Sequence, residues 1–265
     1  MTLLEQVRQG KPITGIEIID IHAHLGRWGF SVPDVTPGGI VESMDRIGIA
    51  KTVVAPMPRI SAEDASRGNR EVFDAMRAYP GRLLGYVHFW PSSAEEVGAE
   101  MERCVEAGCT GVKLHNVNGF PYTHPAYAPA LAVASERRMP VLVHTWAQEA
   151  DFNQCREIAE RYPGVSLLLA HSGSDNVEGY VRIARECDNV YLELAMSLSP
   201  RGLVQRLVEE AGVDKVVWGS DVCFLNQAQQ LGKVVGADLS EQDKVKVLST
   251  NAQRILARAG QTSAS

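Results

Sequence analysis

Short apolar runs alternate along this chain with longer segments in which apolar and polar residues recur at helical spacing. The first run, IEIIDIH at 16–22, is nearly all isoleucine at its apolar positions. Most of the runs are continuously apolar, which is typical of parallel strands covered on their outer face by helices. The eight predicted strands are 17–22, 51–56, 83–89, 111–116, 140–145, 166–171, 190–195 and 215–220.

An amphipathic segment follows each predicted strand, and several carry helix start and stop signals, such as Ser93 ahead of Glu95 and Glu96, with Gly108 at the far end. Eight strand–helix units without a break in composition predict one α/β domain over 1–265, a (β/α)8 TIM barrel with its core at about 16–259. The predicted helices are 36–48, 69–80, 93–108, 125–138, 148–163, 177–188, 201–212 and 240–259.

A doubly wound open sheet is the structural alternative. That fold usually places a glycine-rich phosphate loop after its first strand. Here the first strand is followed by His22, Ala23 and His24 instead. The sequence therefore favours the closed barrel.

Six of the seven histidines fall at the carboxyl ends of predicted strands. His22 and His24 are two residues apart, so in a strand they share a face. In a TIM barrel the strand ends converge at one mouth, where the active sites of this fold lie. The polar residues at these ends are His22, His24, His88, Lys113, His115, His144, His171, Glu193 and Asp221.

Neutral imidazoles and a carboxylate, with no thiolate cluster beside them, suit Zn²⁺ or a similar divalent metal. A His-x-His pair alone is a weak signal, but three further groups occupy matched positions: His144, His171 and Asp221. The alternative without a metal is that each histidine is a structural residue, hydrogen-bonded in the core. That explains one or two of them more easily than all five groups together, so we predict a metal site.

Composition and charge restrict the partners. The net charge is −6 and the chain has no basic run, which argues against nucleic acid as a partner. No segment has the roughly 18 apolar residues that span a bilayer, and the N-terminus lacks a signal-peptide pattern. The five cysteines lack CxxC spacing. We expect reduced thiols, a cytoplasmic location, a small-molecule substrate and a homodimer formed through outer helices or loops.

An ordered set of motifs resembles the amidohydrolase superfamily. It is most similar to the amidohydrolase-related branch, which contains both metal-dependent hydrolases and non-oxidative decarboxylases. The matching motifs span most of the chain and are IIDIHAHLG, GVKLH, VLVHT, LLLAHSG, VVWGSD and the terminal NAQRIL. A departure is Val222-Cys223-Phe224 after the Gly-Ser-Asp, where relatives often carry Pro or another small turn residue. We expect a different pocket wall there.

The resemblance implies that His22, His24 and His144 bind the metal, with Asp221 as a ligand or base and His171 as the polar catalytic partner. We expect a metal-activated water to cleave an ester, lactone or amide bond of a small molecule, with Asp221 taking the water's proton. The alternative is non-oxidative decarboxylation of a small unsaturated or aromatic acid. A third interpretation is an inactive barrel that binds a metal or ligand.

The number of metal ions depends on Lys113. In binuclear relatives a lysine on the fourth strand is carboxylated and bridges two ions, whereas the branch with a Gly-x-Lys-Leu-His context keeps it unmodified. We expect one Zn²⁺, with Mn²⁺ or a second ion as the alternatives. Glu193 is interpreted as a partner that orients a ligand histidine. The residues predicted to contact the substrate are Lys113, His115, His88, Trp28, Trp146 and Arg59.

Overall fold

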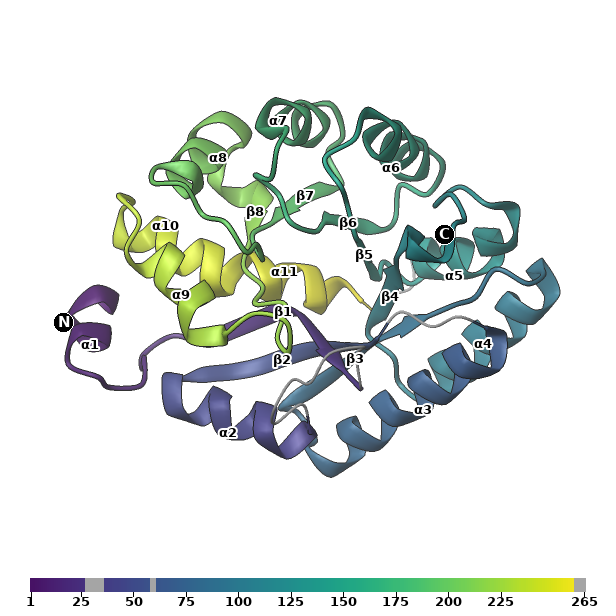
Figure 1. Ribbon diagram of the computed structural model, residues 1–265, viewed down its shortest axis with the longest axis horizontal. Helices are drawn as coiled ribbons and strands as arrows, with labels where there is room; N and C mark the ends of the chain where they lie inside the picture. The colour runs from purple at the N-terminus through teal and green to yellow at the C-terminus, as the bar shows by residue number, and fades with distance from the viewer. Residues whose placement is uncertain (27–35, 58–60, 260–265) are drawn as a thin grey trace.

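Eight parallel strands follow one another around a barrel in chain order in the computed structural model, which describes residues 1–26, 36–57 and 61–259 (Figure 1). This confirms the predicted single-domain (β/α)8 fold. The structured strands are mostly shorter than the apolar runs. They are β1 (Ile18–Leu25), β2 (Ile49–Pro56), β3 (Leu83–His88), β4 (Gly111–Leu114), β5 (Pro140–Val143), β6 (Ser166–Leu169), β7 (Val190–Glu193) and β8 (Val216–Val217).

The segment that begins with β8 returns to β1 and nearly closes the barrel. The N–H of Ile21 donates to the Trp218 carbonyl at 3.2 Å, and the N–H of Asp221 donates to the His22 carbonyl at 2.7 Å. An isolated parallel bridge pairs Ala23 with Val222. These contacts hold the polar ends of the first and last strands together.

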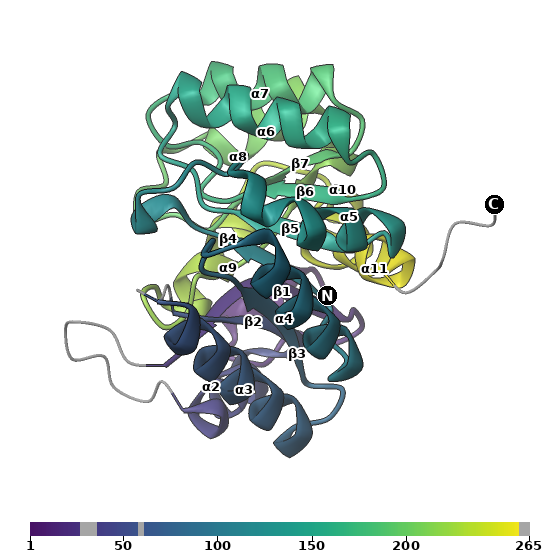
Figure 2. The same cartoon turned by 90° about the vertical axis from the view of Figure 1, so that its right-hand side faces the viewer.

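Helices cover the outside of the sheet, with α2 and α3 on the side opposite α6 and α7 (Figures 1 and 2). Several helices begin after a capping residue, because the Thr36, Ser61 and Ser93 side chains accept hydrogen bonds from N–H groups of the first turn. The cap at Ser93 agrees with the start signal in the sequence. The helices around the barrel are α2 (Pro37–Ile47), α3 (Ala62–Ala78), α4 (Ala94–Glu106), α5 (Ala128–Glu136), α6 (Glu149–Arg161), α7 (Val177–Glu186) and α8 (Leu203–Ala211).

The last predicted helix, 240–259, consists of α10 (Glu241–Val245), a π-helical turn (Lys246–Thr250) and α11 (Asn251–Arg258). This C-terminal region packs against β1 and β8. Ala252 and Ile255 join the apolar cluster inside the barrel. Two helices were not predicted, α1 (Leu3–Arg8) and α9 (Gln227–Val235).

A bulge in β1 sets which side chains enter the barrel. Ile19 and Ile21 belong to the interior apolar cluster, whereas Ala23 belongs to the layer under the helices. Asp20 pairs with Thr52 and Ala23 with Val54, so β1 contains one more residue than β2 between these pairs. An extra residue reverses the alternation of faces. His22 and His24 therefore point into the interior like Ile21. Without the bulge, the strict alternation of a strand would place them on the opposite face from Ile21.

Within the described ranges, no helix is both long and apolar enough to cross a membrane. All five cysteines are buried and unpaired. The predicted homodimer and cytoplasmic location stay predictions.

Candidate metal centre

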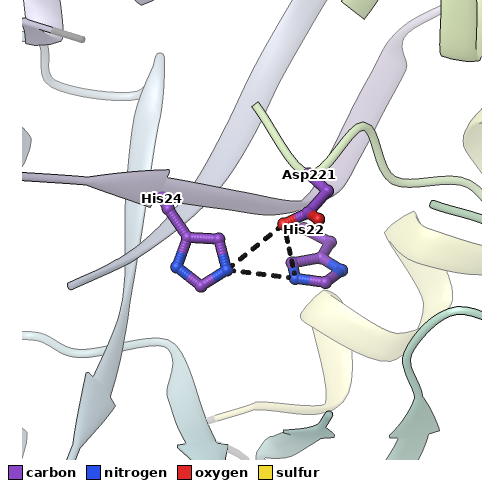
Figure 3. A group of neighbouring side chains, drawn as sticks. All are labelled: His22, His24 and Asp221. Carbon is purple, nitrogen blue, oxygen red and sulfur yellow. Dashed lines mark hydrogen bonds and ion pairs between the residues drawn. The ribbon is translucent and has the colours of Figure 1, made fainter. Parts of the chain in front are cut away.

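Three ligand atoms converge at the carboxyl ends of β1 and β8. The Nε2 atoms of His22 and His24 lie 3.3 Å apart, and Oδ1 of Asp221 lies 3.4 Å from the first and 3.3 Å from the second (Figure 3). All three residues are buried or nearly so, and they form one of two groups of potential metal ligands among the described residues. The predicted association of His22, His24 and Asp221 is therefore present in the structure.

The donor chemistry of this group fits a cation. Nδ1 of His22 faces Oε2 of Glu193 at 2.8 Å, and Nδ1 of His24 faces the Pro56 carbonyl at 3.4 Å. Because both of those partners are oxygen acceptors, each Nδ1 carries the proton and each Nε2 presents a lone pair. Two lone pairs and a carboxylate oxygen 3.3–3.4 Å apart repel one another, and a positive ion between them would relieve this repulsion.

Lys113 supplies a positive charge beneath this group. Its Nζ lies 3.0 Å from Nε2 of His22, and its side chain is fully buried inside the barrel. Burial lowers the pKa of Lys113 to about 8, although Asp221 and Glu193 act in the opposite direction. Lys113 thus contacts a proposed metal ligand directly, deeper than the substrate-contact position predicted for it.

Glu193 orients His22, as the sequence suggested. Its Oε2 accepts the hydrogen bond from His22 Nδ1, while Oε1 accepts one from the Ala195 N–H at 2.6 Å. The second ligand group, His22–His171–Glu193, shares both of these residues. Since Glu193 and Nδ1 of His22 already bind each other, this second group favours a supporting role over a second ion.

His171 and His144 form a pair beside the first group. Nδ1 of His171 donates to the Ala195 carbonyl at 2.7 Å, and its Nε2 lies 3.0 Å from Nδ1 of His144. His144 stacks on His115 with ring centroids 4.0 Å apart. Burial lowers the pKa of all three imidazoles, which favours their neutral forms.

Neither ligand group among the described residues includes His144. Its Nε2 is buried without a hydrogen-bond partner in the described part of the chain, so a lone pair remains available there. Metal ligation by His144 stays a prediction.

The two residues predicted to be catalytic, His171 and Asp221, have unusual backbones. His171 has φ of 63° and Asp221 has φ of 57°, both in the left-handed region that glycine favours. Each residue lies just beyond the end of a strand, where the chain turns across the barrel mouth. Such conformations cost on the order of 1–3 kcal/mol and cluster at functional sites. Here they aim an imidazole and a carboxylate at the same region.

Asp20 is a part of the centre that sequence reasoning missed. This fully buried carboxylate accepts hydrogen bonds from the Ser220 N–H at 2.9 Å, the Ser220 hydroxyl at 2.6 Å and the Gln227 amide at 3.0 Å. It also accepts one from the His22 N–H at the bulge, at 3.3 Å. Burial raises the pKa of Asp20 to about 7, against the effect of these hydrogen bonds. Asp20 thus joins the backbone of His22 to that of Ser220, the residue before Asp221.

Replacing Asp20 by Asn is expected to weaken metal binding by about 10- to 100-fold, the usual effect of losing a group that positions ligands. The new amide NH₂ would face hydrogen-bond donors of Ser220 and Gln227. Because two donors cannot bond to each other, the segment after β8 would shift. Metal titration of the purified variant measures this. Gln227→Ala should produce a smaller loss in the same direction.

Asn251→Ala is the matched control for Asp20→Asn. The Asn251 amide is buried and donates to the carbonyls of Val213 and Val216, both at 2.8 Å, at the opposite end of β8. Its loss should lower stability by roughly 1–3 kcal/mol while metal affinity stays within about twofold. Equal metal affinities for the Asp20 and Asn251 variants would contradict the positioning role.

A cavity of about 920 Å³ opens above the centre. Several predicted site residues line it: His24, His115, His144, Trp146, His171 and Asp221. His88 does not; its Nδ1 lies 3.1 Å from the Lys113 carbonyl, and the residue borders a separate, smaller cavity with Ser66 and Glu100. Trp28 and Arg59 lie outside the described residues.

Much of the cavity wall was not predicted. The loop after β7 contributes Met196, Leu198 and Arg201, and the segment after Asp221 contributes Phe224 and Leu225. Phe224, from the unusual Val-Cys-Phe sequence, is thus part of the pocket wall; whether this wall differs from that of relatives stays a prediction. The sequence of the loop after β7 contains one indication of this role, the large apolar residue Leu198 within the polar stretch SLSPRG.

A (β/α)8 barrel with converging ligand atoms at the carboxyl ends of its strands defines the metal-dependent barrel enzymes as a class. Within that class, this chain belongs to the amidohydrolase family, whose family model matches residues 19–258. Among curated proteins, none matches the chain.

Solved structures with a similar fold include several decarboxylases. The 5-carboxyvanillate decarboxylase of Sphingomonas paucimobilis is 15% identical, with a TM-score of 0.72 over 92% of this chain and 99% of its own. The 2,6-dihydroxybenzoate decarboxylase of Rhizobium is 16% identical, with a TM-score of 0.72 over 91% and 99%. A dihydroxybenzoic acid decarboxylase of Polaromonas with bound manganese is 17% identical, with a TM-score of 0.73 over 91% and 97%. At these identities the likeness shows the shared fold.

Proposed function

We propose that the protein is a metal-dependent, non-oxidative decarboxylase of a small unsaturated or aromatic carboxylic acid. The observation that carries this choice is the likeness, over more than nine-tenths of the chain, to barrels that decarboxylate hydroxybenzoic acids. It favours the decarboxylase alternative over the hydrolysis expected first from the sequence. Both reactions can use the same ligand set, so the centre itself supports either one.

One divalent ion held by His22, His24 and Asp221 is the proposed cofactor. Manganese is bound in the Polaromonas structure, so Mn²⁺ joins Zn²⁺ as a candidate. When bound, the ion supplies positive charge that fixes the acid's oxygen atoms and stabilises negative charge. A single ion is supported by the second ligand group, which reuses His22 and includes a carboxylate already bound to it.

The chain's own residues handle the proton. In decarboxylation the carbon–carbon bond breaks, CO₂ leaves, and the electron pair left on carbon takes up a proton. Asp221 and His171 both border the cavity, so either can reach a bound acid. The hydrogen bond to Ala195 fixes the His171 ring with Nε2 toward His144, which gives the pair a path for proton exchange.

Metal-loaded protein is expected to release CO₂ from hydroxybenzoic acids labelled with ¹³C at the carboxyl group. In D₂O the product should carry one deuterium at the carbon that lost CO₂, because that carbon takes its proton from an exchangeable group. Mass spectrometry measures both isotopes. The His171→Ala variant should form product more slowly, since it lacks one of the two proposed proton carriers.

A parallel panel of esters, lactones and amides separates the two reactions. Release of acid or amine from that panel, without CO₂ from any carboxylic acid, would overturn the proposal and restore the hydrolase interpretation.

A further inference from the structure

The large cavity is wider than a single-ring acid requires. Its volume of about 920 Å³ lies near the upper end of the roughly 300–1,000 Å³ range that encloses drug-sized ligands. The metal centre occupies one end, through His24 and Asp221. The rest of the space lies between the segments that follow β4, β5, β6, β7 and β8.

The mouth of this cavity is apolar and exposed. Among the described residues, five large hydrophobic side chains are exposed, and three of them line this cavity: Val117 at 56%, Trp146 at 52% and Leu198 at 75%. The other two, Met1 and Val7, belong to the N-terminal region. Exposed apolar side chains gathered around one opening mark a binding surface.

Most polar groups on the wall are already satisfied by the protein. The Thr145 hydroxyl donates to the Ala170 carbonyl at 2.6 Å, and the Ser174 hydroxyl lies 3.1 Å from the Tyr180 hydroxyl. Arg206 forms ion pairs with Glu178 at 2.6 Å and Glu210 at 2.7 Å. The wall beyond the metal centre therefore offers a ligand mainly apolar contacts.

Two exposed charged side chains, Asp175 and Arg201, also line the cavity. Their charges are opposite, so these two side chains together add no net charge to the lining.

From the size and the apolar character of this cavity we infer that the substrate is a carboxylic acid with a bulky apolar substituent, a second ring or a hydrocarbon chain. Its carboxylate binds at the metal centre and its apolar part reaches Trp146 and Leu198. This inference rests on the proposed decarboxylation for the reaction, but the size preference is a property of the cavity alone.

The test compares 2-hydroxybenzoic acid with 5-phenyl-2-hydroxybenzoic acid on the metal-loaded protein. We expect the larger acid to have at least a tenfold higher kcat/KM. Calorimetry with the matching phenols, phenol and 4-phenylphenol, measures binding without reaction and should give the same order.

Leu198→Asp should remove most of this preference, because it places a charge on the apolar mouth. Leu198 is three-quarters exposed, so the variant is expected to fold. Val7→Asp is the control, an exposed valine on α1 away from the cavity, and should keep the preference.

The outcomes separate the inference from the proposed function. Release of CO₂ from both acids at equal efficiency would overturn the inference and leave decarboxylation standing. If 4-phenylphenol binds more tightly than phenol but no acid releases CO₂, the preference of the cavity for a larger ligand is supported and the proposed decarboxylation is contradicted. A second copy of the chain could also occupy the apolar mouth. Sedimentation of both variants tests this alternative by measuring their oligomeric state. If Leu198→Asp converts a dimer to a monomer and binding is unchanged, the mouth is an interface and the inference fails.

Discussion

Asp221→Asn is expected to lower turnover by about a hundredfold to ten-thousandfold while the barrel stays folded. One oxygen of Asp221 lies between the two imidazoles, and the residue borders the cavity. Asparagine preserves the shape but brings neither the negative charge nor a group that can carry the proton.

Turnover, circular dichroism and metal content of the Asp221 variant provide the measurements. Asp238→Asn, at an exposed position outside the site, is the control and should keep full turnover. Near wild-type turnover in the Asp221 variant would contradict the catalytic role proposed for Asp221.

Removal of the metal with a chelator is expected to abolish turnover and to lower the melting temperature by roughly 5–11 °C. An ion at 100 times its Kd stabilises the folded state by about 2.7 kcal/mol, and each kcal/mol changes Tm by about 2–4 °C in a chain of this size. The physical cause is the convergence of two lone pairs and a carboxylate oxygen within 3.4 Å. Thermal melts with and without chelator measure the shift.

His22→Ala should eliminate the metal-dependent Tm shift, and His124→Ala should keep it. His124 lies in the loop after β4, where its Nδ1 accepts the Ala126 N–H at 3.3 Å. Elemental analysis should find one equivalent of metal per chain. Two equivalents together with added mass on Lys113 would establish a binuclear centre instead.

The eight strand–helix units were sufficient to predict the barrel, and the histidines at the strand ends indicated which end of it carries the candidate centre. Parallel strands in a closed barrel carry their carboxyl ends to one mouth, so order along the chain determines proximity in space. His22, His24 and Asp221 meet although about 200 positions separate them. The helix boundaries were less predictable: α3 begins at Ala62, because Ser61 caps a first turn with little apolar content.

Contacts that depend on side-chain direction could not be predicted. Asp20 lies inside an apolar run, and nothing in its neighbours indicates that Ser220 and Gln227 reach it from the other end of the chain. The long apolar run of β1 also hides its bulge, since a strand buried on both faces has no alternation to interrupt. His88 illustrates the same limit, because its position at a strand end does not bring it to the large cavity.

The extra residue between Asp20 and Ala23 makes the length of this segment as important as its composition. Deleting one residue there would keep Ile19 inside the barrel but would turn both imidazoles outward, toward the surrounding helices. Conservative substitutions that keep the number of residues in this segment should be tolerated better than such a deletion. Insertions and deletions in β1 should therefore be rarer among active relatives than changes of side chain, and redesign of this barrel should leave the spacing untouched.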